Sequence, residues 1–275
     1  MEVNMELFQI TQATCTKCGA CAEVCPSGLI VLEKKDYPRA VEDIEKHCIR
    51  CGHCVAVCPT GSVIHREMPL AECPPLKAFP GVNFEQCDRL IRGRRSIREY
   101  LDKPVPREII EKLIDSARYA PTGGNSQEVY WMVFNGKDEM NHLAEIGDGW
   151  MRAAAKTNPA TAARMEKLFK MKGSGLDGFL RGAPALIVAY SPKTNPGGVA
   201  NSAIALGYLE LLANSMGLGG CWAGFFMFAV ASFPPMIKAI NLPEGQQVCG
   251  AMMLGYPKYR YARIPARKPA KITWK

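Results

Sequence analysis

Little in this sequence points outside the cytoplasm. The first ten residues, MEVNMELFQI, contain neither the basic start nor the apolar core of a signal peptide. The longest apolar run, residues 220–233, falls short of the ~18 residues that span a bilayer. We therefore expect a cytoplasmic protein with no membrane partner. In that reducing compartment, its twelve cysteines are more suited to metal binding or redox chemistry than to disulfides.

Motifs of several catalytic and binding classes are missing as well. There is no Walker loop, H-E-x-x-H helix, G-x-S-x-G turn or catalytic triad. The net charge of +8 is dispersed, without a zinc finger or an RNP-like aromatic motif, so no nucleic-acid partner is expected. Residues 173–178 read GSGLDG but follow a basic, helix-like segment rather than a buried strand, which argues against a Rossmann site. These absences favour chemistry supplied by a cofactor.

The composition predicts a folded chain of two domains. Of 275 residues, 48% are hydrophobic, which is enough for a sizeable core. Residues 68–81 contain four prolines, which interrupt regular secondary structure. Residues 1–82 carry a net charge of −2 and the remainder +10. We predict a small domain over residues 1–80 and a larger, basic domain over residues 81–275.

A duplicated cysteine motif dominates the first domain. Both copies read C-x₂-C-x₂-C-x₃-C-P, and the second begins 33 residues after the first. In two-cluster ferredoxins of this spacing, three cysteines of a motif bind one [4Fe–4S] cluster and the fourth ligates the other cluster. The expected ligands are Cys15, Cys18, Cys21 and Cys58 for cluster one, and Cys48, Cys51, Cys54 and Cys25 for cluster two.

Zinc or purely structural thiols are the alternative for these eight cysteines. Thiolates suit both metals, but zinc sites usually take C-x₂-C pairs a dozen or more residues apart. Two full copies of the tighter spacing therefore favour iron–sulfur clusters. The remaining cysteines have no partner spacing and receive no role: Cys73, Cys87, Cys221 and Cys249.

The second domain mixes helical and strand patterns. Pro106 is expected in the first position of a helix, because apolar residues recur at helical spacing after it. Residues 129–134, 185–190 and 248–254 have the character of buried strands. Residues 199–216 predict a helix that is apolar nearly all round, which is typical of a central or interface helix. The order of these elements indicates an α+β fold.

Four further motifs carry a resemblance to a known family. Residues 94–100 read RRSIREY, residues 120–127 read APTGGNSQ, residues 217–224 read GLGGCWAG, and residues 255–257 read GYP before a basic tail. In this order and spacing they resemble the FMN-dependent nitroreductase family, and the whole chain resembles its ferredoxin–nitroreductase fusions. The resemblance implies a small ferredoxin-like domain followed by an FMN-binding α+β domain, whose antiparallel or mixed central sheet is flanked by helices.

The resemblance also implies an FMN site. Arg94, Ser96 and Arg98 alternate so that their side chains can converge on one phosphate, although alone they would indicate a solvated basic stretch. Glycines in the loop at 121–127 let the backbone approach a flat ring. The expected FMN contacts, with no dedicated catalytic side chain, are Arg94, Arg95, Ser96, Arg98, Pro121, Thr122, Gly123, Asn125, Gln127, Trp222, Ala223, Gly224, Arg267 and Lys268.

The expected function is that of an iron–sulfur flavoprotein oxidoreductase. Electrons from a low-potential donor, such as a ferredoxin or flavodoxin, would pass through both clusters to FMN and on to an electron-poor nitroaromatic or quinone. In one alternative, NAD(P)H reduces FMN directly and the clusters are the exit. In another, the chain is a non-catalytic electron carrier or redox sensor. The resemblance further implies a homodimer with FMN at the subunit interface, and a lid over residues 147–181.

Overall fold

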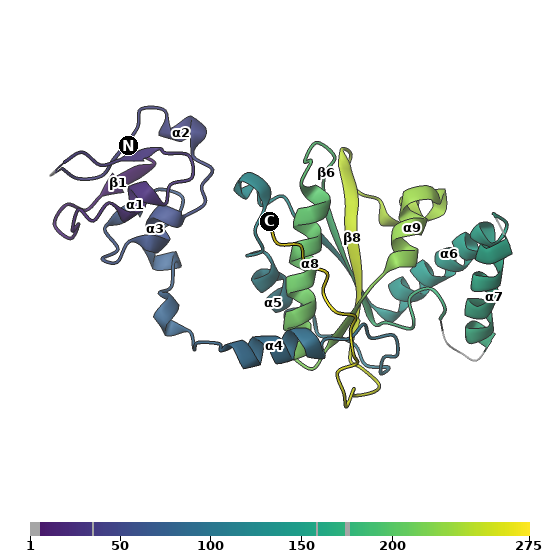
Figure 1. The fold of residues 1–275 in the computed structure, drawn as a ribbon. Helices are drawn as coiled ribbons and strands as arrows, with labels where there is room; N and C mark the ends of the chain where they lie inside the picture. The colour runs from purple at the N-terminus through teal and green to yellow at the C-terminus, as the bar shows by residue number, and fades with distance from the viewer. Residues whose placement is uncertain (1–5, 35, 158, 174–176) are drawn as a thin grey trace. The chain divides into compact units, whose positions relative to one another are not determined.

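The computed structural model of the chain divides into two units, each with its own apolar core. It describes residues 6–34, 36–157, 159–173 and 177–275. The N-terminal unit runs up to Val82 and also includes Gly124–Ser126, while the C-terminal unit consists of Asn83–Gly123 and Gln127–Lys275. Figure 1 labels the principal helices and strands of both units.

Short antiparallel strand pairs and short helices build the N-terminal unit. β1 (Phe8–Ile10) pairs with β4 (Val63–His65), and β2 (Ile30–Val31) pairs with β3 (Arg39–Ala40). The helices are α1 (Ala20–Glu23), α2 (Ile44–His47) and α3 (His53–Val57), followed by 3₁₀ turns at Leu70–Glu72 and Leu76–Ala78. Leu7, Leu29, Val55 and Val63 are among the buried side chains of its core. The strand-like runs expected after each cysteine motif form β2 and β4.

The sequence repeat is also a repeat of backbone conformation. Three positions have a positive φ in both copies: Lys17 and Arg50 (58° and 54°), Gly19 and Gly52 (80° and 73°), and Gly28 and Gly61 (62° and 65°). Gly19 and Gly52 are the N-caps of α1 and α3, where the left-handed conformation favours a residue without Cβ. The two cysteine motifs therefore wrap in the same way.

A four-stranded sheet forms the centre of the C-terminal unit. Its strand order is β5–β6–β8–β7, and each of these pairings is antiparallel. The strands are β5 (Tyr130–Asn135), β6 (Ala185–Pro192), β7 (Gly219–Trp222) and β8 (Gln246–Gly255). Between the two expected sheet types, the structure thus selects the antiparallel one.

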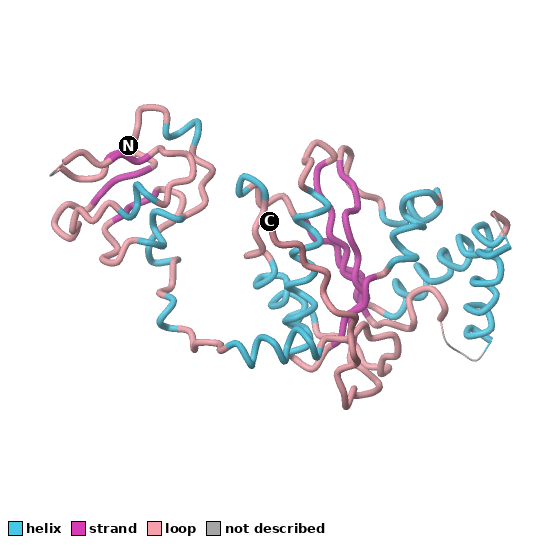
Figure 2. Tube along the Cα trace, viewed as in Figure 1, coloured by secondary structure: helices cyan, strands magenta, loops and turns pink. Residues whose placement is uncertain are grey.

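Helices cover both faces of this sheet (Figures 1 and 2). Leu186 and Val188 of β6 belong to one core cluster, whereas Ile187 and Ala189 belong to the other. α5 (Arg107–Ala117) and α8 (Gly198–Ser215) pack on the second face. The first face is covered by α6 (Lys137–Ala155), α7 (Pro159–Gly173), α9 (Gly224–Ser232) and α10 (Pro234–Ile240). Because both faces are buried, β6 appears in the sequence as a continuous apolar run.

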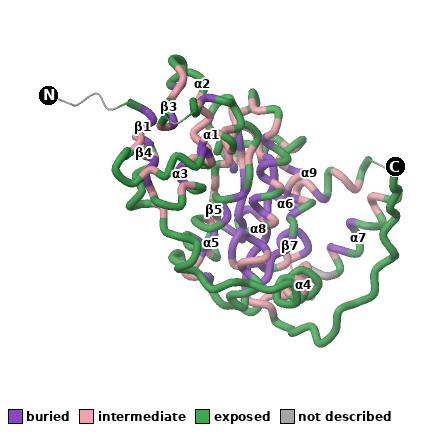
Figure 3. Tube along the Cα trace, turned by 60° about the vertical axis from the view of Figure 1, so that its left-hand side comes forward, coloured by how far each residue is buried: buried purple, intermediate pink, exposed green. Residues whose placement is uncertain are grey.

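The predicted element boundaries hold to within two residues, which is the usual uncertainty of such limits. Pro106 is the N-cap of α5 rather than its first helical residue. The apolar helix α8 buries Leu206 and Leu209 but leaves Val199 and Tyr208 exposed. The chain after β8 is exposed from residue 258 to its end, as the green tube in Figure 3 shows. Within the described ranges, no helix has the length and apolar character needed to cross a bilayer.

Candidate cluster and flavin sites

Four of the predicted cluster cysteines line one cavity in the N-terminal unit. Cys15, Cys18 and Cys21 come from the first motif and the α1 segment, whereas Cys58 follows α3 in the second motif. These are the residues that the cross-ligation pattern assigns to cluster one. The pKa of the Cys21 thiol is raised, mainly by burial and to a smaller extent by the neighbouring Cys58 and Cys15.

The second triplet gathers in the same way. Burial raises the pKa of Cys54 to about 11, with smaller contributions from the adjacent Cys48 and Cys51. The described side chains contain no group of three His, Cys, Asp or Glu residues that would hold a single metal ion. A [4Fe–4S] cluster differs from a single ion, since each of its four cysteines binds a different iron. No described contact joins Cys25 to this triplet, so its place in cluster two stays a prediction.

Backbone amides point at the cysteine sulfurs in matching pairs. Lys17 N donates to Cys15 Sγ at 3.5 Å, and Arg50 N donates to Cys48 Sγ at 3.4 Å. The corresponding pair of donors on the fourth cysteines is Leu29 N to Cys25 Sγ at 3.3 Å and Ser62 N to Cys58 Sγ at 3.2 Å. Amide donors stabilise thiolates and the sulfur ligands of reduced clusters. This donor set fits two iron–sulfur clusters.

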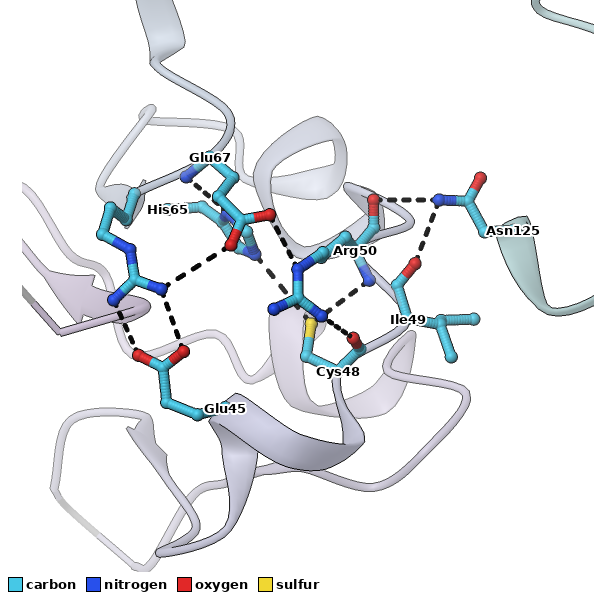
Figure 4. Close-up of polar contacts among 8 residues, drawn as sticks. Glu45, Cys48, Ile49, Arg50, His65, Glu67 and Asn125 are labelled. Atoms are coloured by element: carbon cyan, nitrogen blue, oxygen red, sulfur yellow. Dashed lines mark hydrogen bonds and ion pairs between the residues drawn. The ribbon is translucent and has the colours of Figure 1, made fainter. Parts of the chain in front are cut away.

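A polar network surrounds Cys48 (Figure 4). Arg66 binds both carboxylate oxygens of Glu45, at 2.7 and 2.9 Å, and this pairing lowers the pKa of Glu45. Arg50 Nε donates to Glu67 at 2.7 Å, and Arg50 Nη1 donates to the Cys48 carbonyl at 2.8 Å. The buried His65 ring reaches Cys48 Sγ with Nε2 at 3.9 Å, and burial lowers its pKa.

The arginine motif of the C-terminal unit lies against β7. Ile97 is buried, and its amide donates to the Gly220 carbonyl at 2.9 Å. An ideal Cβ on Gly219 would lie 2.2 Å from Ile97 Cγ1, so this glycine permits the close approach. Tyr100 Oη donates to the Ile97 carbonyl at 2.8 Å, and burial raises the pKa of Tyr100 far above its usual range. The motif is thereby held beside the strand that leads to Trp222.

Arg94, Arg95, Ser96 and Arg98 form a candidate anion-binding site, which is called the arginine cradle below. Arg94 Nη1 donates to the buried Glu210 carboxylate of α8 at 2.8 Å. Arg95 Nε is buried and has no hydrogen-bond partner among the described residues. A buried guanidinium nitrogen without a partner is costly, and a phosphate oxygen would satisfy it. Arg98 and Ser96 act on the pKa of Cys221, which is raised chiefly by burial, so both lie beside β7. The segment therefore fits the FMN phosphate.

The structure divides the predicted flavin loop. Gly123 N donates to Asn201 Oδ1 of α8 at 3.3 Å, and Gln127 N donates to Thr122 Oγ1 at 3.1 Å. Asn125, with Gly124 and Ser126, belongs to the N-terminal unit. Its Nδ2 donates to the carbonyls of residues 49 and 50, each at 3.0 Å (Figure 4). The place of Asn125 in the FMN site stays a prediction.

The amides after β7 are not equally available. Ala223 N donates to the Ala251 carbonyl at 2.9 Å, which leaves that amide occupied. Gly224 begins α9, where first-turn amides lack intrahelical partners, and an added Cβ there would meet nothing within 4 Å. Trp222 is 40% exposed and lies over Gly250 of β8. Of the expected backbone donors to a flavin, Gly224 is the most accessible.

No described hydrogen bond or ion pair joins the predicted tail residues to the arginine motif. Arg267 and Lys268 are exposed and make no hydrogen bond or ion pair with the residues that the structure describes. The start of the tail is bonded to the end of the arginine motif, since Lys258 N donates to the Glu99 carbonyl at 3.0 Å. Further on, Arg263 and Arg89 of α4 (Phe84–Gly93) line one pocket.

The segment predicted as a lid, residues 147–181, contains the second half of α6, α7 and the described part of the turn that follows. Trp150 of α6 stacks on Phe228 of α9, with ring centroids 6.4 Å apart and planes 10° from parallel. Phe179 and Phe225 also contact this ring, at 6.1 and 5.8 Å. Residues 174–176 of the GSGLDG segment lie outside the described residues. Trp150, Phe179, Phe225 and Phe228 therefore form a cluster of rings at α9, the helix that Gly224 begins, and this cluster is called the aromatic shelf below.

Comparison with known proteins decides what this arrangement belongs to. Residues 91–256 match the nitroreductase family, and residues 14–62 match the 4Fe–4S dicluster domain. The chain belongs to the nitroreductase family. This member of the nitroreductase family carries an N-terminal dicluster domain, and it is an oxidoreductase related to FMN reductases and nitroreductases.

Individual relatives agree with this assignment. The FMN reductase [NAD(P)H] of Bacillus subtilis is 30% identical over 188 residues, covering 64% of this chain and 67% of the relative. A putative NADH dehydrogenase/NAD(P)H nitroreductase of Archaeoglobus fulgidus is 25% identical, covering 64% of this chain and 87% of the relative. A Bacteroides fragilis nitroreductase solved with bound FMN shares the fold, with a TM-score of 0.58 and 21% identity over 70% of this chain and 99% of that one.

Several residues of this nitroreductase that matter to the sites escaped the sequence analysis. Glu210, Asn201 and Ser202 are the buried polar side chains of an otherwise apolar helix, and that interruption was a usable signal. His65 occupies the place that Leu32 holds in the first copy of the repeat, which a comparison of the copies would have exposed. Their partners, however, lie on other elements and are visible only in the fold.

Proposed function

We propose that this nitroreductase takes electrons from a low-potential protein donor and delivers them to an electron-poor nitroaromatic or quinone, using two [4Fe–4S] clusters and one FMN. When bound, FMN supplies the ability to accept electrons singly and to release them in pairs. The observation that carries the proposal is the pairing of the two sites on one chain. One site is the cavity shared by Cys58 and the first cysteine triplet, and the other is the arginine cradle against β7.

The residues of the cradle would bind and orient the flavin. Arg95 Nε, which lacks a partner, and the flanking Ser96 and Arg98 present donors for a phosphate. Glu210 holds the Arg94 guanidinium in a fixed orientation. Gly224, at the open start of α9, presents a backbone amide to a flat ring. This proposal keeps all the FMN residues predicted from the sequence, and among them Asn125 has its Nδ2 bonded to the carbonyls of residues 49 and 50.

The aromatic shelf suits the acceptor. Trp150 stacks on Phe228 and lies tilted by 43° against Phe225, and Arg164 lies 4.9 Å from the Phe225 ring centre. Aromatic faces and a nearby guanidinium favour flat, electron-poor rings. The acidic N-terminal unit, cytoplasmic location and homodimer expected from the sequence are retained as parts of the proposal.

A second candidate function reverses the role of the clusters. The similarity to the Bacillus subtilis FMN reductase [NAD(P)H] favours a nicotinamide as the donor to FMN, with the clusters as the exit for electrons. No described segment forms a separate nicotinamide-binding fold, so the nicotinamide would have to stack over the flavin itself.

Anaerobic purification followed by iron, sulfide and FMN quantification tests the first proposal. About eight irons per chain with one FMN is the expected result. Absence of flavin despite intact clusters would contradict both candidate functions. The donor is then identified by adding reduced ferredoxin or NAD(P)H and following the bleaching of the flavin absorbance.

A pair of variants separates the two electron routes. Cys18→Ser removes a ligand of cluster one only, and Cys87→Ser changes an exposed cysteine of α4 as the matched control. If electrons enter through the clusters, Cys18→Ser slows flavin bleaching by ferredoxin, and Cys87→Ser does not. Bleaching by NAD(P)H at the wild-type rate in both variants, with none by ferredoxin, would support the second candidate.

A further inference from the structure

The hydrogen bonds of His65 determine which of its ring nitrogens carries the proton. The ring is buried at the end of β4, with 4% of its surface exposed. Its Nδ1 lies 3.2 Å from Glu67 N and accepts that amide proton, as Figure 4 shows. A nitrogen that accepts from an amide has no proton of its own, so the neutral ring carries its proton on Nε2. Nε2 is the atom 3.9 Å from Cys48 Sγ, and it is therefore a donor to that sulfur.

The internal repeat provides a comparison within the same molecule. Cys48 and Cys15 occupy equivalent places, and each accepts one backbone amide at nearly the same distance, 3.4 and 3.5 Å. The residue equivalent to His65, 33 positions earlier, is Leu32, which has no side-chain donor. Cys48 thus has a side-chain N–H donor that the repeat does not provide to Cys15.

A hydroxyl near cluster one does not balance this donor. Thr60 Oγ1 lies 3.7 Å from Cys58 Sγ but only 2.6 Å from Ser62 Oγ. Ser62 Oγ lies 2.7 Å from Thr14 Oγ1, which donates to the Thr11 carbonyl. A carbonyl only accepts, so Thr14 must donate to Thr11 and accept from Ser62, and Ser62 in turn must accept from Thr60. The single proton of Thr60 is then directed to Ser62 and not to the sulfur.

The charged side chains around Cys48 do not offset the additional N–H donor of His65. Arg50 and Arg66 face Glu67 and Glu45, two positive groups against two negative ones. Their fields on the sulfur largely cancel because the pairs are close. The His65 N–H is therefore a side-chain donor to Cys48 that the described contacts do not repeat at Cys15.

We propose that His65, acting through Cys48, makes cluster two the higher-potential cluster and so sets the direction of electron exchange inside the N-terminal unit. A hydrogen bond to a ligand sulfur stabilises the more negative, reduced state of a cluster and raises its potential. With both clusters bound, this donor would favour the electron on cluster two over cluster one, and the one-electron exchange would break no bond and move no proton. The inference rests on the proposed two-cluster function and adds the order of the two carriers.

The test is a redox titration of the anaerobically purified full chain, followed by EPR. His65→Leu places the residue type of the first copy at this position, and His47→Leu changes an exposed histidine directly before Cys48 as the matched control. The wild-type protein should give two separate reduction waves. His65→Leu should lower the potential of the upper wave by about 59 mV. For a one-electron couple this corresponds to a tenfold change in the equilibrium constant for electron exchange between the clusters. The lower wave, and both waves of His47→Leu, should stay in place.

Other results would overturn the proposal. They are a single wave in the wild-type protein, an unmoved upper wave in His65→Leu, movement of the lower wave, or an equal shift of both waves. Iron and flavin content separates these failures from a failure of the proposed function, because that function fails if the wild-type chain binds fewer than two clusters.

A second measurement decides the matter if His65→Leu does not load its clusters. Wild-type protein and His47→Leu are grown with ¹⁵N-histidine, poised between the two waves and examined by pulsed EPR. A ¹⁵N coupling to the reduced cluster in both proteins, and in His53→Leu labelled in the same way, supports the proposal, and its absence from any of them overturns it. His65→Gln, which keeps an amide donor, should retain more of the upper-wave potential than His65→Leu.

Discussion

The ion pair between Arg94 and Glu210 offers a quantitative test of the flavin cradle. The Glu210 side chain is 7% exposed and the Arg94 side chain 26%, with 2.8 Å between Nη1 and Oε1. In Arg94→Leu the carboxylate stays buried without its partner. Breaking a buried pair in this way costs about 3 kcal/mol, the lower part of the usual range, because a quarter of the arginine is in contact with water. For a unit of this size, that corresponds to about 6–12 °C in melting temperature.

The double variant makes the reasoning falsifiable. Replacing both partners, as in Arg94→Leu with Glu210→Leu, removes the unpaired charge, so most of the lost stability should return. The assay is thermal unfolding of the flavin-free protein followed by tryptophan emission. All four tryptophans lie in the C-terminal unit, so the signal reports on that unit alone.

The matched control is Arg92→Leu. Arg92 also pairs with a carboxylate, Asp88, but the pair is on the surface of α4 and its loss should cost less than about 1 kcal/mol. The reasoning is refuted if Arg94→Leu destabilises the unit no more than Arg92→Leu does. It is also refuted if the double variant melts as low as Arg94→Leu alone.

Three further changes have defined outcomes. Cys58→Ser should lower the iron content from about eight to about four per chain, although the cysteines of the first motif are all retained. Gly147→Ala should cost about 1–3 kcal/mol, since its Cβ would lie 2.1 Å from a buried aromatic ring, whereas Gly207→Ala, with nothing within 4 Å, should stabilise α8 by about 1 kcal/mol. Arg66 depresses the pKa of Glu45, so the stability from this pair is present at neutral pH and is lost as the pH falls through the folded-state pKa. Glu45→Gln should flatten that part of the acid dependence.

Each of these outcomes has its own check. Iron analysis of Cys87→Ser should still give about eight irons per chain, and a full complement in Cys58→Ser would disprove the cross-ligation. Thermal unfolding followed by tryptophan emission compares the two glycine variants. Equal stability in both would show that the Phe179 ring moves aside at no cost, which contradicts the prediction. The glutamate effect is measured as the difference in cluster retention between wild type and Glu45→Gln from neutral to acidic pH, and no difference would contradict it.

Much of the fold could be predicted because its signals are local. The repeated cysteine spacing predicted the dicluster domain, and matching left-handed glycines at equivalent positions bear it out. The apolar runs predicted β6 and β8, and helical periodicity predicted α5. Such patterns depend on residues that are close in the sequence, so they can be recognised without knowledge of the tertiary structure.

The antiparallel strand order and the partners of the site residues could not be predicted. Arg94 meets Glu210 across 116 positions of sequence, and the Ala223 amide is occupied because β7 pairs with β8 in one particular register. Asn125 Nδ2 donates to the carbonyls of residues 49 and 50, which are 76 and 75 positions away and which no local pattern indicates.

The sequence by itself determined which residues have the chemistry for this protein: eight cysteines in two copies of one motif, an arginine motif and a separate glycine-rich segment. Only the tertiary structure decided what surrounds them. His65 is an ordinary histidine in the sequence, and it becomes a sulfur donor because Glu67 N occupies its other ring nitrogen. A donor acts on a sulfur only through distance and orientation, and these depend on how β4 packs against the cysteine motif rather than on the order of residues along the chain.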